Sequence, residues 1–387
     1  MPASSLPSTF FDLTLEELTE RLRAMGERSF RAKQLYHWVY RRFAESYDEM
    51  TDLPAPLRQR LTEELPLRSL KRAAEQESKD GTTRKALFRL RDGHTIETVL
   101  MLYLPKKGSA WRRTVCVSTQ VGCALGCTFC ATGQMGLARD LSAGEIVEQV
   151  IAFARELRQE GLAKEEQPVT NVVFMGMGEP FANLDGTWKS IHILNDKDGY
   201  ALGARHITVS TVGLVPGIKR LINEKIQVNL AVSLHAPNDA IRSVIMPINK
   251  RYPMDELLKA CREYVDATHR RVFFEYLMIR DLNDGIEHAQ ELGRKLYGMT
   301  AHVNLLPMNP VQGSDLRGSP PARVQAFAEE LRKWGIRSTV RFEKGVDIQA
   351  GCGQLKTAVE KGRRERASRS PSVAPSPSSE GQEVSSA

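Results

Sequence analysis

The sequence predicts an α/β protein: a partial parallel (β/α)6 barrel, preceded by an N-terminal helical domain and a short β-hairpin. Six short apolar segments between residues 114 and 306 alternate with helical patterns, as expected when helices join parallel strands. Residues 1–85 carry helical spacing instead, and Asp92-Gly93 separates two alternating segments, which is a hairpin signal. We therefore expect a helical domain over 1–85, a hairpin connector over 86–108, the barrel over 109–358 and a disordered tail over 359–387.

The first helix of the N-terminal domain begins at a capping box formed by Thr14 and Glu17. A second helix is expected over residues 29–43, where basic and aromatic side chains are interleaved. Such a mixture can hold phosphates and stack on bases, which favours RNA binding. The alternative is an ordinary amphipathic helix with an aromatic core face and a solvated basic face. The sequence of this helix does not decide between them.

The barrel is expected to contain strands over 114–119, 171–175, 206–210, 227–234, 272–279 and 301–306. Helices lie between them, and one begins at Ser142 with Glu145 as a second capping box. The last helix is predicted to have Ser319 as its cap and Pro320 in its first turn. A further strand over 337–342 follows it.

Composition narrows the class of protein. No apolar run approaches the roughly 18 residues that cross a bilayer, and Met1-Pro-Ala-Ser-Ser does not resemble a secretory signal. We therefore expect a cytoplasmic protein without a membrane partner. Six cysteines in 387 residues are too few for a disulfide scaffold and indicate metal binding or catalysis. The formal net charge of +7 favours a polyanionic partner without proving one.

Three cysteines stand together in Cys123-Ala-Leu-Gly-Cys127-Thr-Phe-Cys130, directly after the first barrel strand. Thiolates suit iron–sulfur clusters or zinc, but three are one short of a closed tetrahedral site. Either Cys116 or Cys352 completes a structural zinc site, or one metal corner stays open for chemistry. Cys261 shares an apolar helix face and is expected in the core.

Active sites of parallel barrels lie at the carboxyl ends of the strands, and here these ends are rich in glycine and polar residues. The expected rim is made of the cysteine loop, Gly176-Met-Gly178-Glu179-Pro180, Ser210-Thr211, Ser233-Leu234-His235 and Pro307-Met308-Asn309-Pro310. Each segment alone has an ordinary structural explanation. Together they indicate one site.

The cysteine spacing resembles the cluster motif of the radical S-adenosylmethionine (SAM) superfamily, and Gly176-Met-Gly178-Glu179 resembles its glycine-rich strand end. The resemblance implies a radical SAM barrel in which three thiolates bind a [4Fe–4S] cluster and SAM chelates the fourth iron. The open corner of the triplet is thereby explained. Glycine suits the strand end because it lets a ligand approach the backbone closely.

Cys116 and Cys352, with their neighbours, make the chain similar to the RlmN family of RNA methyltransferases. The resemblance covers about residues 10–357 and includes Phe30-Arg-Ala-Lys-Gln34, Ala143-Gly-Glu-Ile146 and Ser233-Leu-His-Ala-Pro237. Asp140 departs from the pattern, where asparagine is expected.

The resemblance implies methylation of carbon 2 of an adenine, using two SAM molecules per turnover. Cys352 takes a methyl group from one SAM, and cleavage of a second gives a 5′-deoxyadenosyl radical that removes hydrogen from this methyl. The methylene radical then adds to carbon 2. Glu97 would accept the proton of carbon 2, and Cys116 would attack Cys352, forming a disulfide and releasing the product. Without the resemblance, Glu97 would be taken for a solvent-facing strand carboxylate.

The implied cluster ligands are Cys123, Cys127 and Cys130, and the implied SAM contacts are Gly178, Glu179, Ser210, Ser233, Leu234, His235 and Asn309. The expected partners are 23S rRNA, certain tRNAs and an unidentified electron donor, with the protein acting as a monomer. Two alternatives stay open. One is a carbon-8 methyltransferase of the Cfr type, which shares the cysteines, and the other is a zinc-stabilised RNA-binding protein without catalysis.

Overall fold

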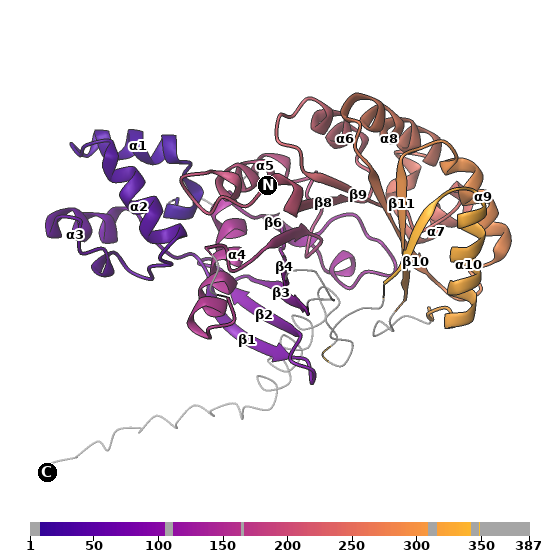
Figure 1. The fold of residues 1–387 in the computed structure, drawn as a ribbon, viewed down its shortest axis with the longest axis horizontal. Coiled ribbons are helices and arrows are strands. Elements are labelled where there is room, and N and C mark those ends of the chain that lie inside the picture. The colour runs from indigo at the N-terminus through magenta and orange to yellow at the C-terminus, as the bar shows by residue number, and fades with distance from the viewer. Residues whose placement is uncertain (1–7, 105–110, 164–165, 309–315, 342–347, 349–387) are drawn as a thin grey trace, which may run out of the picture.

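A ten-stranded, mostly parallel sheet organises the protein (Figure 1). The computed structural model describes residues 8–104, 111–163, 166–308, 316–341 and 348. The sheet runs in the order β1 (Lys71–Glu77), β2 (Thr83–Arg89), β3 (Thr95–Tyr103), β4 (Arg112–Cys116), β7 (Asn171–Phe174), β8 (Ile207–Thr211), β9 (Asn229–Ser233), β10 (Val272–Met278), β11 (Ala301–Pro307) and β12 (Arg337–Val340). Pairs are antiparallel from β1 to β4 and parallel from β4 to β12. Among the described strands the sheet is open, with β1 and β12 at its edges, which confirms the predicted partial barrel.

Helices connect the parallel strands, as the alternating pattern predicted. They are α4 (Ala143–Gln159), α5 (Leu184–Asn195), α6 (Val215–Ile222), α7 (Asp239–Ile245), α8 (Met254–Thr268), α9 (Ile286–Leu296) and α10 (Pro321–Lys333). The capping box of Ser142 and Glu145 is present at the start of α4. None of the helices among the described residues combines the length and the apolar character needed to cross a membrane.

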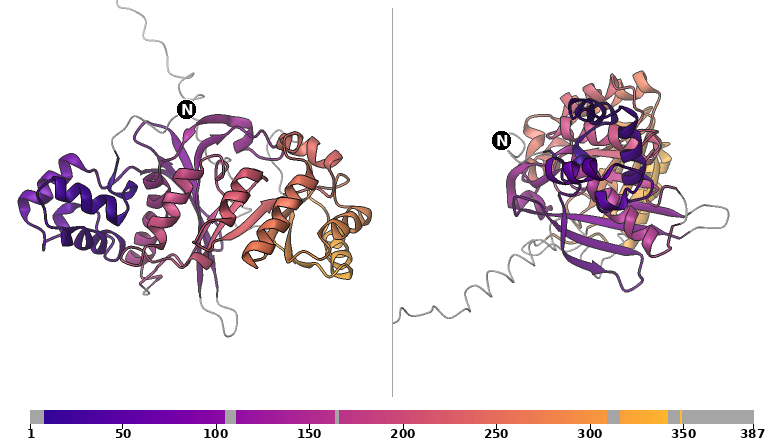
Figure 2. Two further views of the ribbon diagram at one scale, coloured as in Figure 1. Left: turned by 90° about the horizontal axis from the view of Figure 1, so that it is seen from above. Right: turned by 90° about the vertical axis from the view of Figure 1, so that its left-hand side faces the viewer.

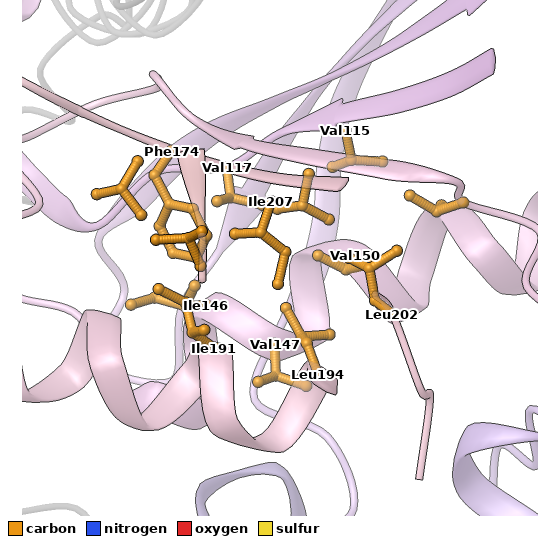
Figure 3. Packing of buried hydrophobic residues seen from close by; sticks show 14 of the residues in the cluster. Val115, Val117, Ile146, Val147, Val150, Phe174, Ile191, Leu194, Leu202 and Ile207 are labelled. Carbon is orange, nitrogen blue, oxygen red and sulfur yellow. The ribbon is translucent and has the colours of Figure 1, made fainter. Parts of the chain in front are cut away.

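The two faces of the sheet differ in character because successive strand residues point to opposite sides. Val115, Val117, Phe174 and Ile207 point toward α4 and α5, where they pack against Ile146, Val147, Val150, Ile191 and Leu194 (Figure 3). The opposite face, which we call the inner face, carries Glu97, Cys116, Ser210, Ser233 and Asn304, as the strand register shows. Apolar burial therefore holds the sheet to its helices, and the polar side chains gather on the other side.

The N-terminal helices α1 (Leu15–Ala24), α2 (Phe30–Tyr40) and α3 (Ala55–Glu64) lie at one end of the molecule (Figures 1 and 2). The predicted capping box of Thr14 and Glu17 is present at the start of α1. Tyr36 and Tyr40 of α2 are buried, as an aromatic core face requires. Asp12 joins this part to the barrel, because its Oδ1 accepts a 2.7 Å bond from the first turn of α4, at the Gly144 N–H.

Two local expectations are wrong, and one element was not predicted. Residues 71–77 are strand β1, not helix: the segment has helix-prone composition, but pairing with β2 supplies hydrogen bonds that override propensity. The cysteine loop is closed by an unpredicted two-stranded ribbon of β5 (Gln120–Cys123) and β6 (Gly136–Asp140). The cap of α10 is Pro320, while the Ser319 hydroxyl donates to Asp284 instead.

Candidate active site

The loop that carries the three cysteines leaves the sheet through the β5–β6 ribbon. Cys123 ends β5 opposite Gly136, and Cys127 and Cys130 follow within the loop. The ribbon requires glycine at position 122, because its φ is +86° and a Cβ would lie 1.9 Å from the Gly136 carbonyl oxygen. The loop rests on α7, since the Thr128 N–H donates to the Ile245 carbonyl at 3.0 Å.

The thiols of Cys123 and Cys127 are buried, and that of Cys130 is half-buried. Burial raises the pKa of Cys123 to about 11 and that of Cys127 to about 12, and repulsion between the thiols adds to both shifts. Such thiols stay protonated unless a cation binds them. Buried apolar side chains surround Cys127, namely Ala236, Ile245, Met246, Ile279 and Met308. This dry, sulfur-only donor set fits an iron–sulfur cluster held by three thiolates.

The zinc alternative gains nothing from the structure. Within the described part of the chain, no three or more His, Cys, Asp or Glu side chains converge on a site for one metal ion. Cys116 lies within β4, where its strand partners are Val99 and Val173, and Cys352 lies outside the described residues. Cys261 is buried on α8, which confirms its predicted place in the core.

The glycine-rich segment after β7 packs tightly against the start of the cysteine loop. A Cβ at Gly176 would lie 2.6 Å from the Val117 carbonyl oxygen. At Gly178, where φ is +100°, it would lie 2.6 Å from the Gln120 Cβ. Gln120 then accepts a bond from the Glu179 N–H at 2.8 Å and donates to Asp140 at 2.7 Å. Asp140, where the sequence departs from the family pattern, therefore connects to this strand end through one intervening side chain, that of Gln120.

Glu179 places a buried carboxylate between the ends of β7 and β8. It accepts bonds from the Phe181 N–H at 3.1 Å and the Val212 N–H at 2.9 Å. Burial raises the pKa of Glu179 to about 7, although these hydrogen bonds act against the shift. A carboxyl in this state is well suited to receive a cationic group, because an incoming charge would favour ionisation.

Ser210, Ser233, Leu234 and His235 lie at the neighbouring strand ends, as predicted. His235 adopts a left-handed backbone (φ +56°), which is held because both Leu234 and His235 donate N–H groups to the Glu275 carbonyl. Its ring meets Phe129 of the cysteine loop edge to face, with 4.9 Å between centroids. Burial and the charge of Arg242 lower the pKa of His235 to about 3. Because the Leu277 N–H donates to Nδ1 at 3.0 Å, the neutral ring carries its proton on Nε2.

Glu97 and Cys116 share the inner face of the sheet. Val99 pairs with Cys116 across β3 and β4, and Glu97 lies two residues from Val99 on the same face. Glu97 is buried and forms an ion pair with Lys85 of β2 at 2.8 Å. It is therefore not the solvent-facing carboxylate that the strand pattern alone suggests. Asn309 and Cys352 lie outside the described residues, so their positions stay predictions.

Two buried residues that the sequence did not single out connect these parts. The Ser118 hydroxyl donates to the Glu97 carbonyl at 2.6 Å and accepts from the Met177 N–H at 2.9 Å. Arg242 donates to the carbonyls of Val212 and Leu234, at 2.6 and 3.3 Å, which ties the ends of β8 and β9 together. For Arg242, the sequence signal was a charged residue among apolar neighbours on the short helix α7. Such a pattern is too common to be diagnostic.

Comparison with known proteins agrees with this geometry. Residues 117–293 match the model of the radical SAM superfamily, and residues 9–66 match that of the ribosomal RNA large subunit methyltransferase N-terminal domain. A probable dual-specificity RNA methyltransferase RlmN from Chloroflexus aurantiacus is 52% identical over 351 residues, covering 89% of this chain and 92% of the relative. The dual-specificity RNA methyltransferase RlmN 1 of Myxococcus xanthus is 47% identical, covering 92% and 97%. The crystal structure of a radical SAM methyltransferase from Sphaerobacter thermophilus matches with a TM-score of 0.85 and 52% identity, over 90% of this chain and 99% of that one.

Proposed function

The chain belongs to the RlmN family of radical SAM RNA methyltransferases, and on this premise we propose that it methylates carbon 2 of a specific adenine in 23S rRNA and in certain tRNAs. The proposal rests on one observation above all. The thiol loop, the Glu179 strand end and the pair of Glu97 and Cys116 gather at the carboxyl end of the parallel strands, linked by hydrogen bonds of Gln120 and Ser118.

The cofactors follow from the donor set. Cys123, Cys127 and Cys130 would hold a [4Fe–4S] cluster, and Gly178, Glu179, Ser210, Ser233, Leu234, His235 and Asn309 would bind SAM. Together these groups would supply the electron and the radical that an unreactive aromatic C–H carbon requires. The buried Glu179 carboxylate suits the SAM amino group, and the neutral His235 offers an Nε2–H donor. Gly178 has φ +100° and no room for a Cβ beside Gln120, so this strand end requires glycine.

Side chains of the protein itself would carry out the remaining steps. Cys352 would carry the methyl group to the base, and Glu97 would accept the proton that leaves carbon 2. The base adduct would lose its proton to Glu97 and one electron to the cluster. The Cys116 thiolate would then attack the Cys352 sulfur: an S–S bond forms, the C–S bond breaks with its electron pair going to the methylene carbon, and that carbon takes up a proton to become the methyl group of the product. Two SAM molecules are consumed per turnover, one as methyl donor and one as radical source.

The N-terminal helical domain would help to hold the RNA while the base is unstacked. Phe30 of α2 is 47% exposed, with the Arg31 guanidinium 4.9 Å from its ring centre. Arg42 lies 4.3 Å from the ring centre of Trp38 on the same helix. An exposed aromatic ring beside a cation, as at Phe30, is suited to stacking on bases and contacting phosphates, while Trp38 is half-buried.

The test is methyl transfer to 23S rRNA fragments and tRNA by anaerobically purified protein, with the methyl position on adenosine mapped by mass spectrometry. Methylation at carbon 2 is expected. Methylation at carbon 8 would instead assign the Cfr-type reaction, and turnover by a Cys352→Ala variant would overturn the mechanism. A colourless protein that contains zinc and lacks iron and sulfide would overturn the cluster assignment.

A further inference from the structure

Lys85 and Glu97 form a buried ion pair beside Cys116. Lys85 Nζ lies 2.8 Å from Glu97 Oε2, and the two side chains are 0% and 2% exposed. In the strand register Lys85 lies opposite Val99, which in turn lies opposite Cys116. Lysine, glutamate and cysteine therefore share the inner face over three adjacent strands.

Stability alone gives little reason for this pair. Removing two charges from water costs several kcal/mol per ion, and replacing a buried ion pair by apolar side chains is often neutral or stabilising. The positions that flank it in the register, Leu87 and Val99, are apolar and buried. An apolar pair would fit the same strands, so the charges themselves call for an explanation.

The Glu97 backbone is held as well as its side chain. The Ser118 hydroxyl donates to the Glu97 carbonyl and accepts from the Met177 N–H, which is one residue from Gly178. Gln149 of α4 fixes this arrangement, since its Oε1 accepts from the Ser118 N–H and from the Thr98 hydroxyl, each at 2.8 Å. Lys85 thus fixes the carboxylate, while Ser118 fixes its strand relative to the glycine-rich strand end.

We propose that Lys85 is a positioning residue for proton transfer: its ammonium group is the counter-charge that holds and orients the Glu97 carboxylate for accepting a proton. This inference rests on the proposed role of Glu97 as proton acceptor. A buried carboxylate without a counter-charge takes up a proton readily, and a protonated acid cannot accept another. On the described residues of β1 to β4, the other titratable groups of this face are Lys71 of β1, Arg89 of β2, Tyr103 of β3, and Arg112 and Cys116 of β4.

The experiment compares Lys85→Met and Lys85→Arg in the cluster-loaded protein, with the rate of adenine methylation measured from about pH 6 to pH 9. Without the lysine charge, the acid limb of the profile is expected to move to higher pH, since each unit of displacement costs about tenfold in rate on that limb. Lys85→Arg keeps the charge and is expected to return the limb toward its original position. Lys333→Met is the matched control, because Lys333 pairs with Glu330 at 2.7 Å but is 72% exposed.

A second readout does not depend on turnover. Infrared difference spectra of the protein, with Glu97→Gln as the reference, report whether the Glu97 carboxyl is protonated. A protonated-carboxyl band is expected near neutral pH in Lys85→Met and not in the unsubstituted protein. This band separates a charge effect from a variant that has simply lost its fold, which circular dichroism would detect.

The outcomes distinguish the proposed role of Glu97 as proton acceptor from the proposed role of Lys85 as its positioning residue. Full turnover by Glu97→Gln would refute the proton-acceptor role itself. Loss of turnover in Glu97→Gln, together with an unmoved acid limb and no carboxyl band in folded Lys85→Met, would overturn the role of Lys85 alone. Equal loss at every pH in Lys85→Met and Lys85→Arg would also overturn it, because that result indicates packing rather than charge.

Discussion

Replacing Gly178 by alanine tests the contact on which the SAM-binding strand end depends. Gly178 has φ +100°, and an added Cβ would meet Gln120 at its Cβ, Cγ and backbone nitrogen, at 2.6, 2.7 and 2.8 Å. Gly93 offers a matched control. Its φ is +88°, but no atom lies within 4 Å of an added Cβ.

Both substitutions put alanine at a positive φ, but only Gly178→Ala also overpacks its surroundings. Alanine at positive φ costs about 1–2 kcal/mol, and this applies to both sites. Overpacking adds about 1–3 kcal/mol at Gly178 alone, because a backbone atom of Gln120 cannot rotate away. Gly178→Ala is therefore expected to lower the free energy of unfolding by about 2–5 kcal/mol, against about 1–2 kcal/mol for Gly93→Ala.

The functional effect follows from the same displacement. Gln120 accepts the Glu179 N–H at 2.8 Å, so moving Gln120 moves the residue proposed to bind the SAM amino group. Urea unfolding measures the stability difference, and equilibrium dialysis of anaerobically reconstituted protein measures SAM affinity. Gly178→Ala should lose affinity, and Gly93→Ala should keep it.

Either of two results would refute this reasoning. Equal destabilisation by both alanines would mean that the Gln120 contact relaxes freely. Unchanged SAM affinity in a folded Gly178→Ala protein would mean that the ligand does not depend on this strand end.

Three further expectations concern titratable groups. Cys127→Ala should lose most of its iron and sulfide after anaerobic purification, whereas Cys261→Ala, which removes a core thiol on α8, should keep both; equal metal content would contradict the cluster assignment. Burial raises the pKa values of Glu148 and Glu179 to about 7 from an ordinary 4.5, so the folded chain binds these protons more tightly than the unfolded chain. Stability should therefore fall as pH rises from about 4.5 through about 7, by up to roughly 3 kcal/mol per group, and Glu148→Gln should flatten the slope in urea unfolding. Because the pKa of His235 is lowered to about 3, its ring should stay neutral from pH 8 down to about pH 5 in NMR spectra, and titration near pH 6.5 would contradict this placement.

Local patterns in the sequence were sufficient for much of the site. The spacing of Cys123, Cys127 and Cys130 puts three thiols on one short loop, whatever lies around them. The strand ends at Glu179, Ser210 and Ser233 were predictable because parallel strands place their carboxyl ends at one edge.

Other features depended on partners distant in the chain. The segment Lys71–Glu77 has the composition of a helix and became a strand because β2 lies beside it. Ser118 forms hydrogen bonds with Glu97 and Met177, which are 21 and 59 positions away in the sequence, and no local sequence pattern predicts these bonds.

Glu97 shows which properties of a residue follow from the local sequence and which depend on the fold. Alternation along its strand determined which side chains share its face, and the resemblance to a known family suggested its role. Only the tertiary structure decided that this face is buried, that Lys85 supplies the counter-charge and that Cys116 lies on the neighbouring strand. The physical reason is that side-chain period is a local property, whereas burial and pairing are set by the register of strands brought together in the fold.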